Sequence, residues 1–140
     1  MMTDREAGAR REFPRSLAAV SDLLDWSERF FEAARIPTDH RFGVQLGLEE
    51  LFTNLVKYGA GSHPIEIELV RRDSVLLASL TDQDVEPFDP TAAPDADTTL
   101  PLDSRKPGGL GLHLVRRVVD RVDYTYENRC SRTTLVKRLG

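Results

Sequence analysis

Cysteine and histidine are scarce in this sequence of 140 residues, and neither is arranged for metal binding. The only cysteine, Cys130, has no partner for a disulfide within the chain, and it rules out cysteine-rich zinc or iron–sulfur sites. The three histidines lie far apart in the sequence, without the spacing of metal ligands. We therefore expect no internal disulfide and no histidine-bound metal.

Long apolar runs are also missing. The longest candidate, VLLASL at residues 75–80, is strand-sized and far shorter than the ~20 residues that a membrane-spanning helix needs. The first residues, MMTDREAGARRE, lack the apolar core of a secretory signal, so we expect a cytoplasmic protein without membrane contact. The net charge of −4 argues against direct nucleic-acid binding, because neutralising phosphates requires a basic surface.

The sequence does contain enough apolar material for one core. Hydrophobic residues make up 40% and charged residues 30% of the chain, which is typical of a single globular domain. We expect residues 1–9 to form a flexible tail and residues 10–140 to form the domain. A short first strand is expected in RREFPR, residues 10–15.

Helical spacing of apolar residues predicts two helices in the first half of the chain. The first follows Ser16, a good N-cap, and the second extends from Thr38, another capping residue type, to about Tyr58. The glycines and proline of GAGSHP, residues 59–64, favour a turn and end the second helix.

The second half of the chain predicts strands around one more helix. The runs IEIELV and SVLLASL indicate a hairpin, GGLGLHLVRRVVDRV a helix, and DYTYEN and TTLVKRL two closing strands. Residues 83–107 contain five prolines and six acidic residues without periodicity, which is typical of a functional lid or a linker. This order predicts an α/β (α+β) two-layer sandwich, with helices packed on one face of a mostly antiparallel sheet.

The segment LGLEELFTNLVKYG on the second helix carries the first candidate site. Helical spacing places Glu50, Asn54 and Lys57 on one face, apart from the apolar face. A carboxylate one turn from a carboxamide combines a base with a neutral oxygen ligand, which magnesium accepts when substrate phosphates fill its other positions. An ordinary solvent-exposed helix can carry the same short pattern by chance. This motif therefore supports a binding site only together with other motifs.

The segment PGGLGL, residues 107–112, directly precedes the third helix. Gly108 and Gly109 let backbone amides approach an anion at the positive end of the helix, and Gly111 permits close passage of a ligand or backbone. A glycine-rich helix entry without a ligand is the alternative. The chain contains neither the P-loop pattern G-x-x-x-x-G-K-[ST] nor the dinucleotide pattern G-x-G-x-x-G.

The segment LTDQDVEPFDP, residues 80–90, follows the apolar run of the central strand. At the end of that strand, the carboxylate of Asp82 can accept a hydrogen bond from an exocyclic amine, by which a protein distinguishes adenine. An acidic turn without a ligand is the alternative.

In this order and spacing, the segments resemble the GHKL superfamily of ATP-binding domains with its Bergerat-type fold, and in particular the anti-sigma-factor serine kinases. The resemblance covers roughly residues 14–139. It rests on E-E-x-x-x-N, the strand that ends in Asp82 before PFDP, GGLGLHLVRRVVD, and the closing TTLVKRL. It implies that the chain binds ATP and Mg²⁺, with the family's ATP lid at about 83–107.

The resemblance also implies a role for each matching residue. Asn54 matches the asparagine that ligates magnesium, and Glu50 matches the general base that acts on the substrate serine. Asp82 matches the aspartate that contacts adenine, and Thr134 is similar to a last-strand threonine that supports this contact. The phosphate-side glycines of the family correspond to Gly108, Gly109 and Gly111.

Two further features concern the lid and its surroundings. Arg105 and Lys106 stand at the end of the expected lid. From their charge and position, we expect them to reach the terminal phosphate. The family has Asp-x-Gly after the central strand, whereas the third position here is Asp84, and one extra residue precedes PFDP. A side chain and a charge thus stand where the backbone bends towards the base, which leaves open whether Asp82 or Asp84 is the adenine ligand.

The function implied by the resemblance is that of a protein serine/threonine kinase. Such a protein sequesters a sigma factor and phosphorylates a STAS-domain antagonist on serine, and a homodimer is an expected assembly. The alternative, favoured by Asp84, is a non-catalytic or weakly ATP-binding partner-switching module on the same fold. A sensor histidine kinase fits less well, because it needs an upstream acceptor histidine and the first 40 residues contain only His40.

Overall fold

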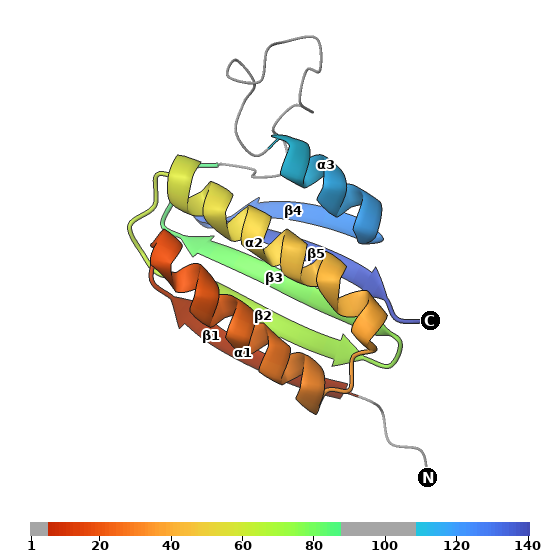
Figure 1. Ribbon diagram of the computed structural model, residues 1–140. Helices are drawn as coiled ribbons and strands as arrows, with labels where there is room; N and C mark the ends of the chain where they lie inside the picture. The colour runs from red at the N-terminus through yellow and green to blue at the C-terminus, as the bar shows by residue number, and fades with distance from the viewer. Residues whose placement is uncertain (1–5, 88–108) are drawn as a thin grey trace.

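The computed structural model describes residues 6–87 and 109–140, which form two layers (Figure 1). One layer is a five-stranded sheet with the order β1-β2-β3-β5-β4, in which all neighbouring strands pair antiparallel. The strands are β1 (Glu6–Phe13), β2 (Ile65–Arg72), β3 (Val75–Gln83), β4 (Arg121–Glu127) and β5 (Cys130–Arg138).

The second layer consists of helices that lie on one face of the sheet (Figure 1). They are α1 (Val20–Ala33), α2 (Arg41–Tyr58) and α3 (Gly109–Val118), with the 3-10 turns η1 (Leu17–Ala19) and η2 (Thr38–His40) before the first two. This arrangement confirms the predicted two-layer sandwich. None of the helices that the structure describes is long and apolar enough to cross a membrane.

The core fills the space between α2 and the centre of the sheet. Side chains of a strand alternate between its two faces, so every second residue of the central strands points towards the helices. These core residues are Ile65, Ile67 and Leu69 of β2, Leu76, Ala78 and Leu80 of β3, and Leu135 of β5. They meet Leu48, Leu51, Phe52 and Leu55 of α2, all at most 2% exposed. Each large apolar side chain buried here contributes ~1.5–3 kcal/mol, which fixes α2 on the sheet.

Several element boundaries differ from the sequence-based expectation; α3, for example, ends at Val118, and residues 121 and 122, which we expected in this helix, begin β4. The strand β1 begins at Glu6 rather than at residue 10, because residues 6–9, which we expected in a flexible tail, pair with β2 up to Arg72. Ser16 is confirmed as an N-cap, since its Oγ accepts a hydrogen bond from the amide of Ala18 at 3.1 Å. Thr38 is not a cap: it is the first residue of η2, whose N-cap position is Pro37 without a side-chain hydrogen bond.

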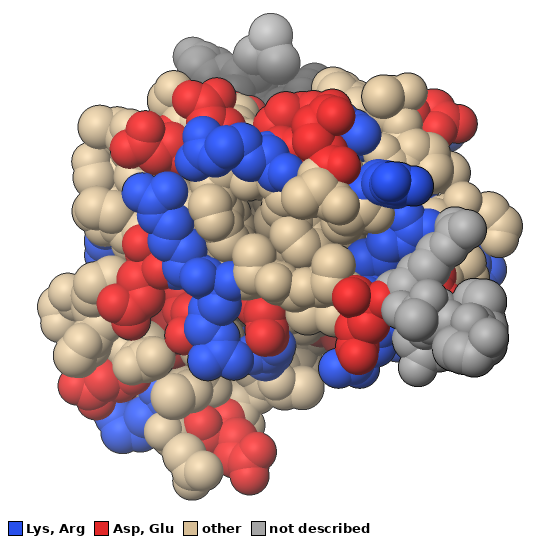
Figure 2. Space-filling model, turned by 90° about the horizontal axis from the view of Figure 1, so that it is seen from below, with Lys and Arg blue, Asp and Glu red and all other residues tan. Residues whose placement is uncertain are grey.

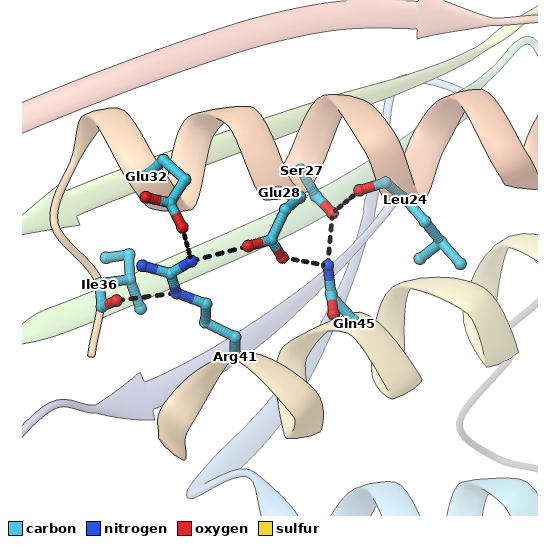
Figure 3. A network of polar contacts seen from close by, with 7 residues as sticks. All are labelled: Leu24, Ser27, Glu28, Glu32, Ile36, Arg41 and Gln45. Carbon is cyan, nitrogen blue, oxygen red and sulfur yellow. Dashed lines mark hydrogen bonds and ion pairs between the residues drawn. The ribbon is translucent and has the colours of Figure 1, made fainter. Parts of the chain in front are cut away.

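A polar network joins α1 to the start of α2 (Figure 3). The guanidinium of Arg41 donates to Glu28 at 2.7 Å, to Glu32 at 2.5 Å and to the carbonyl of Ile36 at 2.8 Å. One turn later, Gln45 donates to Glu28 at 3.1 Å. The hydrogen bonds with these two carboxylates raise the pKa of Arg41. The network fixes the position of α2, which carries two of the candidate site residues.

The surface around β1 and α1 carries charges of both signs. Figure 2 shows this side of the molecule, with basic and acidic side chains interspersed rather than gathered by sign. Several of these residues pair with one another, including Arg10 with Glu68 and Arg72 with Glu6. The face in view therefore lacks the continuous basic surface that binds a phosphate backbone.

Candidate nucleotide-binding site

The second half of α2 and the start of α3 lie at the same end of the sandwich. A Cβ at Gly43 would lie 2.8 Å from the carbonyl oxygen of Val118, and one at Gly47 would lie 3.3 Å from Val115. Glycine at both positions lets the helices come this close. Because the earlier glycine of α2 meets the later valine of α3, the helices run antiparallel, and α3 begins beside the part of α2 that carries Asn54 (Figure 1).

Asn54 is a largely buried residue whose carboxamide stays accessible. The residue is 6% exposed, and its side chain makes no hydrogen bond within the part of the chain that the structure describes. Its amide atoms are not among the enclosed side-chain atoms without a partner, so the carboxamide is open to a ligand at this face. No group of three or more acidic, histidine or cysteine side chains among the described residues forms a metal cage. The residues present thus fit magnesium held by one amide oxygen together with substrate phosphates.

Glu50 lies one helical turn before Asn54, on the same face of α2. Its side chain is half-buried, and this burial raises the pKa of the carboxyl above its usual value of 4.5. The neighbouring Glu49 also raises the pKa, whereas Lys57 lowers it. A carboxylate with a raised pKa is a stronger proton acceptor, which suits a general base.

Asp82 is the last but one residue of β3, with its carboxylate facing the helices and only 2% of the residue exposed. Its Oδ1 oxygen is bound by the guanidinium of Arg15, which follows β1. Arg15 also donates to the carbonyl of Leu55 at 3.1 Å and to that of His63 at 3.2 Å. These contacts place Asp82 beside the second half of α2. Sequence reasoning missed Arg15, because no local pattern links residues that are 67 positions apart.

The carboxylate of Asp84, the alternative adenine ligand, has different partners from the carboxylate of Asp82. Its backbone φ is 54°, in the left-handed region that glycine adopts most easily, so the aspartate occupies a glycine-like turn. Its exposed carboxylate pairs with Arg129 at 2.9 Å, and this hydrogen bond lowers the pKa of Asp84. His63 lies 3.8 Å away on the other side. The structure therefore does not bring the carboxylates of Asp82 and Asp84 together.

Thr134 lies on the face of the sheet without helices, opposite to the face that carries Asp82. It pairs with Ser79 across β3 and β5, and the two hydroxyls are 3.0 Å apart. Because side chains alternate along a strand, the preceding residue, Thr133, shares the helix-covered face with Asp82. Thr133 is 2% exposed and stands opposite Leu80, two residues before Asp82.

The remaining predicted residues are only partly covered by the structure. Gly109 and Gly111 belong to the first turn of α3, so the helix begins within the glycine-rich segment rather than after it. Arg105, Lys106 and Gly108 lie outside the described residues, as does most of the expected lid. The structure describes the first residues of the expected lid. There, the amide of Val85 donates to the carbonyl of Arg129 at 2.9 Å.

Comparison with known proteins agrees with this fold. Residues 13–137 match the histidine kinase-like ATPase domain family. The chain is 30% identical over 118 residues to the serine/threonine-protein kinase BtrW of Bordetella bronchiseptica, a match that covers 83% of each protein.

Solved structures with the same fold include two at low sequence identity. The RsbU and RsbW domains of Rv1364c from Mycobacterium tuberculosis match 95% of this chain with a TM-score of 0.68 at 13% identity, although this chain spans only 32% of theirs. The Acinetobacter baumannii histidine kinase AdeS matches 94% of this chain and 68% of its own, with a TM-score of 0.52 at 13% identity. The family match over most of the sequence, together with the 30% identical relative, shows that the chain belongs to the histidine kinase-like (GHKL) ATPase domain family.

Proposed function

We propose that the chain is an ATP-dependent protein serine kinase of the anti-sigma-factor type. In this proposal it works in the cytoplasm, holds a sigma factor inactive, and phosphorylates a STAS-domain antagonist on serine. The single observation that supports the kinase proposal is that a half-buried carboxylate, Glu50, and an accessible carboxamide without a hydrogen bond, Asn54, share one helix face where α3 begins. The kinase name of the 30% identical relative supports the same reaction class.

Asn54 and α3 would hold the phosphate end of the nucleotide. The amide oxygen of Asn54 is the one protein ligand that we assign to magnesium, and the metal would neutralise charge on the phosphates. The helix α3 begins at Gly109, where exposed amides and the positive end of the helix favour an anion. Glycine at this point lets the backbone approach the phosphates.

Glu50 would act as the general base. The serine hydroxyl of the antagonist gives its proton to the Glu50 carboxylate as its oxygen attacks the terminal phosphorus of ATP and ADP departs. Half-burial raises the pKa of this carboxyl, which brings its proton affinity closer to what the reaction needs at neutral pH. The neighbouring Glu49 is exposed and points away from this face, so it serves as a matched control.

A partner-switching module without kinase activity is the second candidate. The observation that favours it is the occupied carboxylate of Asp82, which Arg15 already binds in the nucleotide-free chain. A protein that kept the fold but lost ATP affinity would retain its partner-binding surfaces.

The two candidates are separated by incubating the chain with ATP labelled at the terminal phosphate, magnesium and a panel of STAS-domain proteins. The kinase proposal predicts a labelled serine on at least one of them. It also predicts that Glu50→Gln lowers the rate by ~10²–10⁴-fold, whereas Glu49→Gln leaves it within about twofold. Binding of a STAS-domain protein without any transfer of label would favour the partner-switching module.

A further inference from the structure

The guanidinium of Arg15 is held in a buried junction of three segments. It binds the carboxylate of Asp82 at the end of β3, the carbonyl of Leu55 on α2, and the carbonyl of His63 in the loop before β2. The Arg15 side chain is 13% exposed and the Asp82 side chain 3% exposed. This pair is therefore unlike the ion pairs of the surface, such as Arg10 with Glu68, in which the arginine is 63% exposed.

The loop backbone closes over this ion pair at Gly61. A Cβ at Gly61 would clash with the Arg15 guanidinium and would lie 2.7 Å from Cγ1 of Val85 and 2.8 Å from Oδ1 of Asp82. Neither the guanidinium nor the loop leaves room for a ligand atom at this oxygen. A base can reach Oδ1 of Asp82 only if one of the present neighbours of this oxygen moves away.

The guanidinium and the exocyclic amine of adenine offer the carboxylate the same chemistry. Each presents N–H donors, and the Oδ1 oxygen, bound by Arg15 and approached by Gly61, cannot accept both in its present surroundings. Building on the proposed function, we infer that Arg15 is a positioning residue of the nucleotide site. It occupies Asp82 in the free chain, competes with the purine amine, and so limits the affinity for ATP.

Arg15 can release Asp82 without losing all its partners. Its other contacts go to two main-chain carbonyls, which stay in place when the carboxylate turns towards a base. Release therefore breaks one contact of the three. The nucleotide's amine would then satisfy the buried carboxylate in place of the guanidinium, and binding of the base and release of Arg15 would be linked.

Calorimetry with two nucleotides tests this inference: ATP, and the triphosphate of purine riboside, which lacks the 6-amino group. Arg15→Gln removes the charge that holds Asp82 but keeps a neutral donor. We expect this variant to bind ATP about tenfold more tightly, as when a ligand no longer competes with a charged hydrogen bond. Its affinity for the amine-free analogue should stay within about twofold of the parent. Arg10→Gln is the control and should change neither affinity.

The outcomes separate this inference from the proposed function. If the parent binds ATP but Arg15→Gln binds it equally or more weakly, or changes both nucleotides alike, Arg15 is not a competitor for Asp82 and only this inference is wrong. If neither protein binds either nucleotide, the proposed function fails with it. Should Arg15→Gln fold poorly, the guanidinium resonances of Arg15 in the parent decide. The reporting signal is that of Nη2–H, which contacts Asp82, while Nε–H, bound to the His63 carbonyl, is the internal control. The Nη2–H signal should shift and exchange faster with ATP but not with the analogue, and an identical response to both would overturn the inference.

Discussion

Arg15 and Asp82 form a buried ion pair that reaches across β2. Arg15 follows β1 and Asp82 lies at the end of β3, and β2 lies between these strands in the sheet. Removing one partner leaves the other charge buried without compensation, which costs about 3–5 kcal/mol in proteins. We therefore expect Arg15→Ala to lower the free energy of unfolding by about 3 kcal/mol or more.

Urea denaturation followed by circular dichroism measures this change. The matched control is Arg10→Ala, which removes an exposed pair with Glu68 and should change stability by less than about 1 kcal/mol. Equal effects of the two substitutions would mean that the Arg15–Asp82 pair does not differ from a surface contact.

Glu50 should destabilise the fold at neutral pH, in keeping with a functional role. Burial raises its pKa in the folded state above the ordinary 4.5. The folded protein therefore binds more protons than the unfolded chain between these two values, and stability falls as the pH rises through that window. Because this loss grows with pH, Glu50→Gln should raise the melting temperature at neutral pH more than at acidic pH.

The gain from Glu50→Gln should disappear at about pH 4 and below, where the parent carboxyl is protonated in both states. Thermal unfolding of parent and variant over this pH range measures the difference. Glu49→Gln, at the exposed neighbour, should show a smaller gain. A Glu50→Gln variant less stable than the parent at neutral pH would show that ionised Glu50 is stabilised by the fold instead.

The two neighbouring threonines of β5 should differ in their effect on nucleotide binding. Thr133 shares the covered face with Asp82, whereas the hydroxyl of Thr134 meets Ser79 on the other face. We expect Thr133→Val to weaken ATP binding by about three- to tenfold, the value of one neutral hydrogen bond, and Thr134→Val to leave it unchanged. Fluorescence titration with a labelled ATP analogue measures both, and the reverse order would restore Thr134 as the site residue.

Asp84→Gly tests whether the turn after β3 needs its aspartate. Glycine adopts a φ of 54° without strain, so the backbone should keep its conformation. The lost pair with Arg129 is exposed and contributes little. Calorimetry should give unchanged or tighter ATP binding. A large loss of affinity would instead assign the adenine contact to Asp84.

Local patterns predicted much of the fold but not its long-range contacts. Apolar spacing identified α1 and α2, and the i, i+4 relation placed Glu50 and Asn54 on one face, because helix geometry is set within a few residues. The start of β1 was missed, since Ala7, Gly8 and Ala9 offer no strong alternation and gain their structure by pairing with β2. The orientation of Thr134 was equally beyond local patterns, because only the register with β3 decides which of two adjacent threonines faces the helices.

The antiparallel packing of α2 and α3 shows which motifs meet. Gly43 and Gly47, which no functional pattern singled out, allow the contact with Val118 and Val115. This contact brings the glycine-rich start of α3 to the end of α2 that carries Asn54. An alanine at Gly43 would place its Cβ 2.8 Å from a backbone oxygen, so this helix pair has little tolerance there.

The most direct test of the central claim is the affinity of the Asn54→Ala variant for ATP in the presence of magnesium. The Asn54 carboxamide makes no hydrogen bond within the described part of the chain, so its removal should leave the melting temperature nearly unchanged. Isothermal titration of parent and variant with ATP, with magnesium and with a chelator, compares the two proteins. We predict that the parent binds ATP with magnesium and that Asn54→Ala, equally folded, loses this binding. Equal magnesium-dependent affinity in both proteins would contradict a nucleotide site built on Asn54.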